Sequence, residues 1–326
     1  MIARRLLAAG PSGGAFTTLP VNLKGLINAA VDNTYVYTIG PFSSSDGGAT
    51  FTVGSGATIT HGTGWESTYV KDPYLVWDGS QYVCYYTGFD GTNMRIGRAT
   101  ASAIDGTWTK YGSNPVLTLG SSGQFDEYRI NFPVVVYSAT ESPPWKMWYA
   151  GWTPPPADID ITIGFADSTD GISWTKRGQV LDLGPSGHFD DAGVIPGTVI
   201  KVGSTWYLLY TGFRSDIYYS GGYATCTDPA DSGTYVRGAE WSNYAGNLTF
   251  GGKTWRSNQP RNVLRYGDQY LILGSAWNPT AGGEEGAFAV FSSDLTNPPA
   301  PTGLLLPLGS GWDANTAENP SALWLP

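Results

Sequence analysis

The sequence predicts an all-β fold, a five-bladed β-propeller in which each blade is a four-stranded antiparallel sheet. The first reason is a repeat in which an aromatic–acid pair precedes, by seven or eight residues, a proline that opens an apolar run. Its copies are Trp65-Glu66 to Pro73, Phe125-Asp126 to Pro133, Phe189-Asp190 to Pro196, Trp312-Asp313 to Pro320 and a shortened Trp255 to Pro260. A spacing of about sixty residues is long for a solenoid and fits a propeller blade.

Composition is the second reason. Aromatic residues make up 14% and charged residues 14% of the chain, with 44 Gly and 22 Pro, which is typical of many short strands joined by tight turns. The net charge of −9 argues against a surface that follows nucleic-acid phosphates. No run of eighteen apolar residues occurs in the sequence, so we expect no membrane insertion.

The order of the predicted strands is the third reason. In residues 65–122, extended runs at 73–77, 81–88, 94–100 and 104–110 are separated by turn signals. The same order recurs in 123–186, 187–252 and 253–310. The fifth blade is divided, with 311–326 joined to 15–64: residues 34–38 and 44–51 supply its outer strands and 321–324 its first strand. This arrangement closes the ring, so we expect residues 1–326 to form a single propeller domain.

Two hairpins carry an acid that we interpret as structural. In Ser44 to Phe51 and in Ser168 to Trp174, an aspartate is placed to accept hydrogen bonds from turn amides while the aromatic residue packs between sheets. Cys84 and Cys226 fall in blades that are not neighbours, so we expect free, buried thiols.

Several of these motifs resemble the five-bladed propeller glycosidases, especially glycoside hydrolase family 43. They are Val70-Lys71-Asp72-Pro73, Tyr85-Tyr86-Thr87-Gly88 and the run from Ile163 to Trp174. The resemblance implies three acids at the starts of innermost strands: a general base or nucleophile, an acid that modulates pKa, and a glutamate that donates a proton. Hydrolysis requires two carboxyl groups with separated pKa values across the glycosidic bond.

Asp72 stands where the resemblance places the first of these acids. The next two blades have Asn131-Phe132-Pro133 and Val194-Ile195-Pro196, without an acid at the matching position, whereas Glu318 precedes Asn319-Pro320 in the fifth blade. The candidate catalytic residues are Asp72, Glu318, Asp191 and Glu127. Asp72 is the expected base or nucleophile, and the other three compete as proton donor. Alternatively, Arg129 or Arg261 pairs with Asp72 or Glu318 in a structural network.

Acids that recur at one repeat position are set aside as structural braces; these are Glu66, Asp126, Asp190 and Asp313. Trp152 and Trp277 follow second strands and precede long loops, so they are candidates for stacking on sugar rings. The alternative for these aromatics is core packing. Polar residues expected to bind sugar hydroxyl groups are Arg129, Asn131, Asn258 and Arg261.

We therefore favour a glycoside hydrolase acting on a plant or microbial polysaccharide or oligosaccharide by carboxylate acid/base catalysis. The missing acids in two blades support an alternative, a non-catalytic glycan-binding or structural module such as a phage-tail or cell-surface propeller. The expected partner is carbohydrate, not nucleic acid, and an extracellular or virion-associated location is favoured over a cytoplasmic one. We expect no required cofactor and no metal site, although calcium can bind on the axis of such propellers. The sequence leaves the oligomeric state open.

Overall fold

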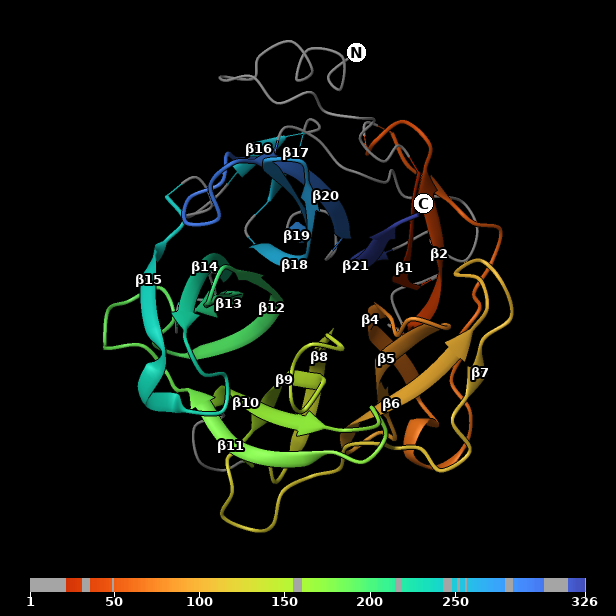
Figure 1. Ribbon diagram of the computed structural model, residues 1–326, viewed down its shortest axis with the longest axis horizontal. Coiled ribbons are helices and arrows are strands. Elements are labelled where there is room, and N and C mark those ends of the chain that lie inside the picture. The colour runs from red at the N-terminus through yellow and green to blue at the C-terminus, as the bar shows by residue number, and fades with distance from the viewer. Residues whose placement is uncertain are drawn as a thin grey trace.

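The computed structural model describes most of the chain, namely residues 22–30, 36–48, 50–154, 160–214, 219–242, 248–250, 253–255, 257–278, 284–301 and 316–325. For a few of these the backbone alone is described: 248–250, 253–255, 257, 258, 277, 278, 284, 285, 316 and 317. Antiparallel sheets surround a single axis, which confirms the predicted five-bladed β-propeller (Figure 1). No helix in the described residues is long and apolar enough to cross a membrane.

Each blade is built outward from an innermost strand. Blade 1 comprises β4 (Tyr69–Trp77), β5 (Tyr82–Phe89), β6 (Met94–Ala101) and β7 (Thr109–Lys110), and blade 2 comprises β8 (Arg129–Tyr137), β9 (Trp145–Trp152), β10 (Ile161–Ser168) and β11 (Thr175–Leu181). Blade 3 comprises β12 (Gly193–Val202), β13 (Thr205–Phe213), β14 (Tyr219–Cys226) and β15 (Val236–Glu240). In blade 4 the described strands are β18 (Ser257–Tyr266), β19 (Gln269–Asn278) and β20 (Glu284–Ser292). Smaller elements are the hairpin of β16 (Leu248–Phe250) and β17 (Lys253–Trp255), and the 3-10 turns η1 (Gly64–Glu66) and η2 (Ser232–Thr234).

Blade 5 joins the two ends of the described chain. Its strands are β21 (Thr316–Trp324), β1 (Leu23–Ala30), β2 (Thr38–Ser44) and β3 (Thr52–Val53), and Figure 1 shows β21 beside β1. The predicted C-terminal first strand is confirmed. The third strand was wrongly expected at 34–38, because a short aromatic and β-branched run resembles a strand. Residues 23–30 have little β propensity and were missed; they form a strand because β21 and β2 both pair with them.

The recurring acids brace three blades in the same way. Each acid accepts a hydrogen bond from a tyrosine hydroxyl on the second strand of its blade. Each also forms an ion pair with a lysine or arginine on the fourth strand. The sets are Glu66 with Tyr86 (2.9 Å) and Lys110 (2.5 Å), Asp126 with Tyr149 (3.0 Å) and Lys176 (2.6 Å), and Asp190 with Tyr210 (2.7 Å) and Arg237 (2.5 Å). The structural prediction for these acids is confirmed, and Asp313 lies outside the described residues.

The two hairpin acids are also structural. Asp170 accepts hydrogen bonds from the backbone N–H groups of Ile172 (2.8 Å) and Ser173 (2.7 Å). Burial works in the opposite direction, but these backbone bonds prevail and lower the pKa of Asp170 to about 2. Trp174 packs edge-on against Tyr85 of blade 1, with ring centroids 5.7 Å apart. Both cysteines are free and buried, as predicted.

Neighbouring blades are joined near the axis by side-chain oxygens. An innermost strand has no ladder partner on its axial side, so its buried N–H groups need other acceptors. Such acceptors are Thr87 Oγ1 for Phe132 N (3.3 Å), Thr198 Oγ1 for Val263 N (3.1 Å), Asn262 Oδ1 for Ala322 N (3.2 Å) and Ser321 Oγ for Leu75 N (2.9 Å). The last of these fastens blade 5 to blade 1 and so closes the ring.

Replacing Ser321 with alanine is expected to lower the free energy of unfolding by about 2 kcal/mol, because it leaves the N–H group of Leu75 buried without an acceptor. Ser80→Ala, which removes an exposed hydroxyl in a turn, is the control and is expected to change stability by less than about 0.5 kcal/mol. Urea unfolding followed by tryptophan fluorescence measures both. Equal effects of the two substitutions would contradict the closing role of Ser321.

Candidate active site

The innermost strands change register where each reaches its proline. In β4 and β8 the shift lies between Lys71 and Tyr74 and between Asn131 and Val134. Three residues that directly precede a proline have a positive φ: Asp72 (54°), Phe132 (51°) and Asn319 (53°). This region is unfavourable for side chains other than glycine, and such strain is often found at functional sites. The bulges turn these three residues toward the axis from blades 1, 2 and 5.

A cavity of about 330 Å³ lies at this end of the axis and is lined by residues from all five blades. We call it the funnel; its lining is Tyr37, Lys71, Met94, Asn131, Phe132, Trp152, Ile161, Ile195, Tyr219, Gln259, Arg261, Glu318 and Asn319. A narrow axial cavity of about 20 Å³ shares three of these residues and adds Asp72. The funnel is within the size range of small-ligand sites.

Asp72 lines the narrow axial cavity and is 4% exposed. Asn319 Nδ2 donates a hydrogen bond of 2.9 Å to its Oδ1. Its Oδ2 has no hydrogen-bond partner among the described residues. Burial raises the pKa of Asp72, and the nearby Glu318 raises it further, while Lys71, Arg261 and the Thr87 hydroxyl oppose the shift. Asp72 therefore keeps its proton to a higher pH than an exposed aspartate does.

Glu318 lines the funnel and is connected to Asp72 through the buried Asn28. Asn28 Nδ2 donates to Glu318 Oε1 at 3.0 Å, and Asn28 Oδ1 accepts from the backbone N–H of Asp72 at 3.2 Å. One amide group thus holds both candidate acids. The predicted alternative was an ion pair from Arg129 or Arg261 to Asp72 or Glu318. The ion pairs found among the described residues include none of these combinations.

The structure places Glu127 and Asp191 in loops instead. Each accepts a hydrogen bond from the backbone N–H of a glycine four residues earlier, Gly123 or Gly187. Both glycines have a φ of 85°, so the two loops form the same turn. Neither acid lines the funnel or the axial cavity. Their geometry is that of turn residues, and they are not brought to Asp72.

Trp152 and Asn131 lie together in the wall of the funnel. Trp152 Nε1 donates to Asn131 Oδ1 at 2.8 Å, which fixes the indole ring and the amide group relative to each other. Asn131 is 1% exposed, and its Nδ2 has no hydrogen-bond partner among the described residues. A buried donor without an acceptor is costly, so a ligand atom in the funnel that accepts this bond would be favoured.

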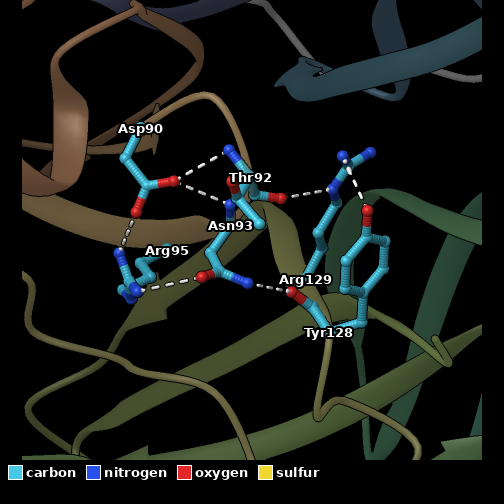
Figure 2. Close-up of polar contacts among 6 residues, drawn as sticks. All are labelled: Asp90, Thr92, Asn93, Arg95, Tyr128 and Arg129. Atoms are coloured by element: carbon cyan, nitrogen blue, oxygen red, sulfur yellow. Dashed lines mark hydrogen bonds and ion pairs between the residues drawn. The ribbon is translucent and has the colours of Figure 1, made fainter.

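Arg129 was expected to bind sugar hydroxyl groups, but it lies outside the funnel. Figure 2 shows its Nε donating to the carbonyl of Thr92 (3.0 Å) and its Nη2 to the hydroxyl of Tyr128 (3.1 Å). In the same view Asp90 accepts from the backbone N–H groups of Thr92 (2.9 Å) and Asn93 (2.8 Å). Arg129 does not line the funnel; it fastens the turn between β5 and β6 to blade 2.

Arg261 does line the funnel, and sequence reasoning missed its neighbours. Its Cζ lies 4.5 Å from the centre of the Phe132 ring, and its Nη2 donates to Gln259 Oε1. Lys71 Nζ lies 5.4 Å from the same ring. Gln259 and Asn319 precede the repeat proline as Asp72 does, so the repeat contained the signal for them. For Asn258 and Trp277 the structure describes only the backbone, in β18 and β19.

Calcium fits poorly on the described part of the axis. Its usual coordination is six to eight oxygen ligands. The narrow cavity has the carboxylate of Asp72 as its one acid and the guanidinium group of Arg261 beside it. Within the described residues no group of three or more His, Cys, Asp or Glu side chains is arranged to hold a metal ion.

The chain resembles known propellers in sequence and in structure, although no protein-family model matches it. It is 26% identical over 217 residues to the probable arabinan endo-1,5-alpha-L-arabinosidase A of Aspergillus flavus and to that of Aspergillus oryzae. The match covers 65% of this chain and 59% of each relative, so it spans less than two thirds of their length.

Solved structures agree on the fold. A structure described as a glycoside hydrolase has a TM-score of 0.64 at 15% identity, covering 86% of this chain and 87% of its own. The β-1,2-mannobiose phosphorylase of Listeria innocua has a TM-score of 0.58 at 15% identity, covering 78% of this chain and 66% of its own. Together with the sequence match, these similarities confirm the resemblance to the five-bladed propeller glycosidases.

Proposed function

We propose that this propeller is carbohydrate-active and that its funnel binds a saccharide for cleavage of a glycosidic bond. The observation that carries the proposal is the placement of two acids by Asn28, whose side-chain amide bonds the carboxylate of Glu318 and the backbone N–H of Asp72. Glu318 lines the funnel, which has Trp152 in its wall, and Asp72 lines the narrow axial cavity. The similarity to an arabinosidase, a glycoside hydrolase and a mannobiose phosphorylase supports the substrate class.

The two acids differ in environment, as acid/base cleavage requires. Burial raises the pKa of Asp72, so we assign the role of proton donor to this carboxyl group. The sequence alone led us to expect a base or nucleophile role for Asp72, so the two roles are alternatives for the same carboxyl group. Glu318 lines the open funnel and accepts the hydrogen bond from Asn28, so it is placed to act on the sugar as a carboxylate. Trp152 offers an aromatic surface for a sugar ring.

A glycan-binding module without catalysis is the second candidate. It is favoured by Phe132 and Ile195, which line the funnel at the two positions where the resemblance implies acids. The two candidates are separated by incubating the chain with arabino- and manno-oligosaccharides, with and without inorganic phosphate, and measuring both retention and product. Product formation supports cleavage, and retention without product supports the binding module. The absence of both retention and product would contradict the proposal.

Trp152→Ala is expected to weaken saccharide binding about tenfold, because it removes the stacking surface and the bond that orients Asn131. Trp77→Ala provides a matched control, since Trp77 is 46% exposed and does not line the funnel. Isothermal titration with a saccharide that the parent chain binds measures both. Unchanged affinity in Trp152→Ala would remove Trp152 from the site.

A further inference from the structure

The charge of the funnel is opposite in sign to the charge of the chain. The sequence has 27 Asp and Glu against 18 Lys and Arg, a net charge of −9. Among the described residues that line the funnel, the charged side chains are Lys71, Arg261 and Glu318. Two cations and one acid give this wall a positive balance. An acidic protein that gathers basic side chains in a funnel on its axis is suited to an anionic ligand.

The donors also lie on one side of the funnel, around Phe132. Arg261 and Lys71 are both within cation–π distance of this ring, at 4.5 and 5.4 Å, which holds their charged ends beside it. Asn131 precedes Phe132 in β8 and has the buried Nδ2 donor without a partner in the described structure. An amide nitrogen can only donate, so Asn131 Nδ2 is satisfied by an acceptor, and the two positive charges beside it favour an acceptor that is negatively charged.

We propose that the saccharide bound in the funnel is acidic and that the carboxylate of a uronic acid residue faces Lys71, Arg261 and Asn131. A carboxylate supplies two acceptor oxygens and matches the planar fork of a guanidinium group. The described funnel wall has two cations and one acid, so it has one positive charge in excess, and the single negative charge of the carboxylate would neutralise it. The inference rests on the proposed function, because it names the class of saccharide for the same site.

The test compares an oligogalacturonide with its fully methyl-esterified form of the same length by isothermal titration calorimetry. The parent chain is expected to bind the acid at least about tenfold more tightly than the ester, with the difference decreasing as salt rises. Lys71→Met and Arg261→Met are each expected to weaken binding of the acid about tenfold and binding of the ester by a smaller factor, because the ester keeps an acceptor oxygen but carries no charge. Lys24→Met is the control, because Lys24 forms an exposed ion pair with Asp105 away from the funnel.

Each outcome decides the inference. Because Arg261 is 6% exposed and its replacement could impair folding, Lys71→Met provides an independent variant. Equal binding of acid and ester, or binding of neutral arabino- or manno-oligosaccharides alone, overturns the inference and leaves the proposed function standing. Binding of inorganic phosphate without any acidic saccharide also overturns it. If no saccharide binds, both the inference and the proposed function fail.

Discussion

Asp72→Asn is expected to reduce glycoside turnover by roughly 100-fold or more, while leaving the folded chain at least as stable as the parent at neutral pH. The asparagine keeps the oxygen that accepts the hydrogen bond from Asn319 and lacks the titratable proton. It therefore removes the chemistry of the site without removing the contact. A residue with a purely structural role would show the opposite pattern, with activity lost only as stability is lost.

The expected stability follows from the direction of the pKa shift. Burial raises the pKa of Asp72 above its ordinary value of 3.8 in the folded chain. Below that value both folded and unfolded chains carry the proton, so the group has no effect. As pH rises above it, the unfolded chain ionises first, and the folded state loses stability until pH passes the raised pKa. Asparagine does not titrate, so the variant escapes this loss.

Turnover measurements on the parent and the variant test the predicted loss of activity. Urea unfolding at about pH 3 and pH 7 tests the predicted difference in stability. Asp191→Asn is the matched control: its acid accepts a hydrogen bond in a turn outside both cavities, so turnover is expected to stay at the parent level. Full activity in Asp72→Asn, or equal losses in the two variants, would refute the assignment of Asp72.

Asp190→Ala is expected to have the largest effect on stability, lowering the free energy of unfolding by about 3 kcal/mol. Asp190 is 0% exposed and accepts from Tyr210 and Arg237 at once. Its removal leaves a buried hydroxyl without an acceptor and breaks the link between the second and fourth strands of blade 3.

The comparison for this prediction is Asp105→Ala, which breaks the exposed ion pair with Lys24 and is expected to cost less than about 1 kcal/mol. Thermal and urea unfolding of both variants give the difference. If Asp190→Ala unfolds like the parent, the repeated acid is not a brace and its recurrence needs another cause.

The repeat allowed the fold to be predicted because each copy encodes the same contacts. The aromatic–acid pair specifies the brace, and the proline specifies the bulge at the axis. Blade 5 was harder, because Leu23–Ala30 has no strand signal of its own and depends on pairing with β21 and β2. Asn28, which holds both candidate acids, lies on that strand and was missed for the same reason.

The site was predicted in part. Asp72 and Glu318 were found because they break the repeat, and both reach the axial cavities. Glu127 and Asp191 were kept as candidate proton donors, because the sequence did not reveal that each accepts a hydrogen bond in the same kind of turn. The bond between Trp152 and Asn131 depends on the register of β8 with β9, and the placement of Arg129 depends on a turn from another blade. Such contacts between strands cannot be read from spacing along the chain.

The most direct test of the account is a crystal structure of the chain soaked with a saccharide that it binds. We expect the sugar to lie in the funnel, with a ring against Trp152 and a glycosidic oxygen within hydrogen-bond distance of Glu318 or Asp72. A sugar bound on an outer blade surface, with the funnel unchanged, would contradict the assignment of the funnel as the site of carbohydrate chemistry.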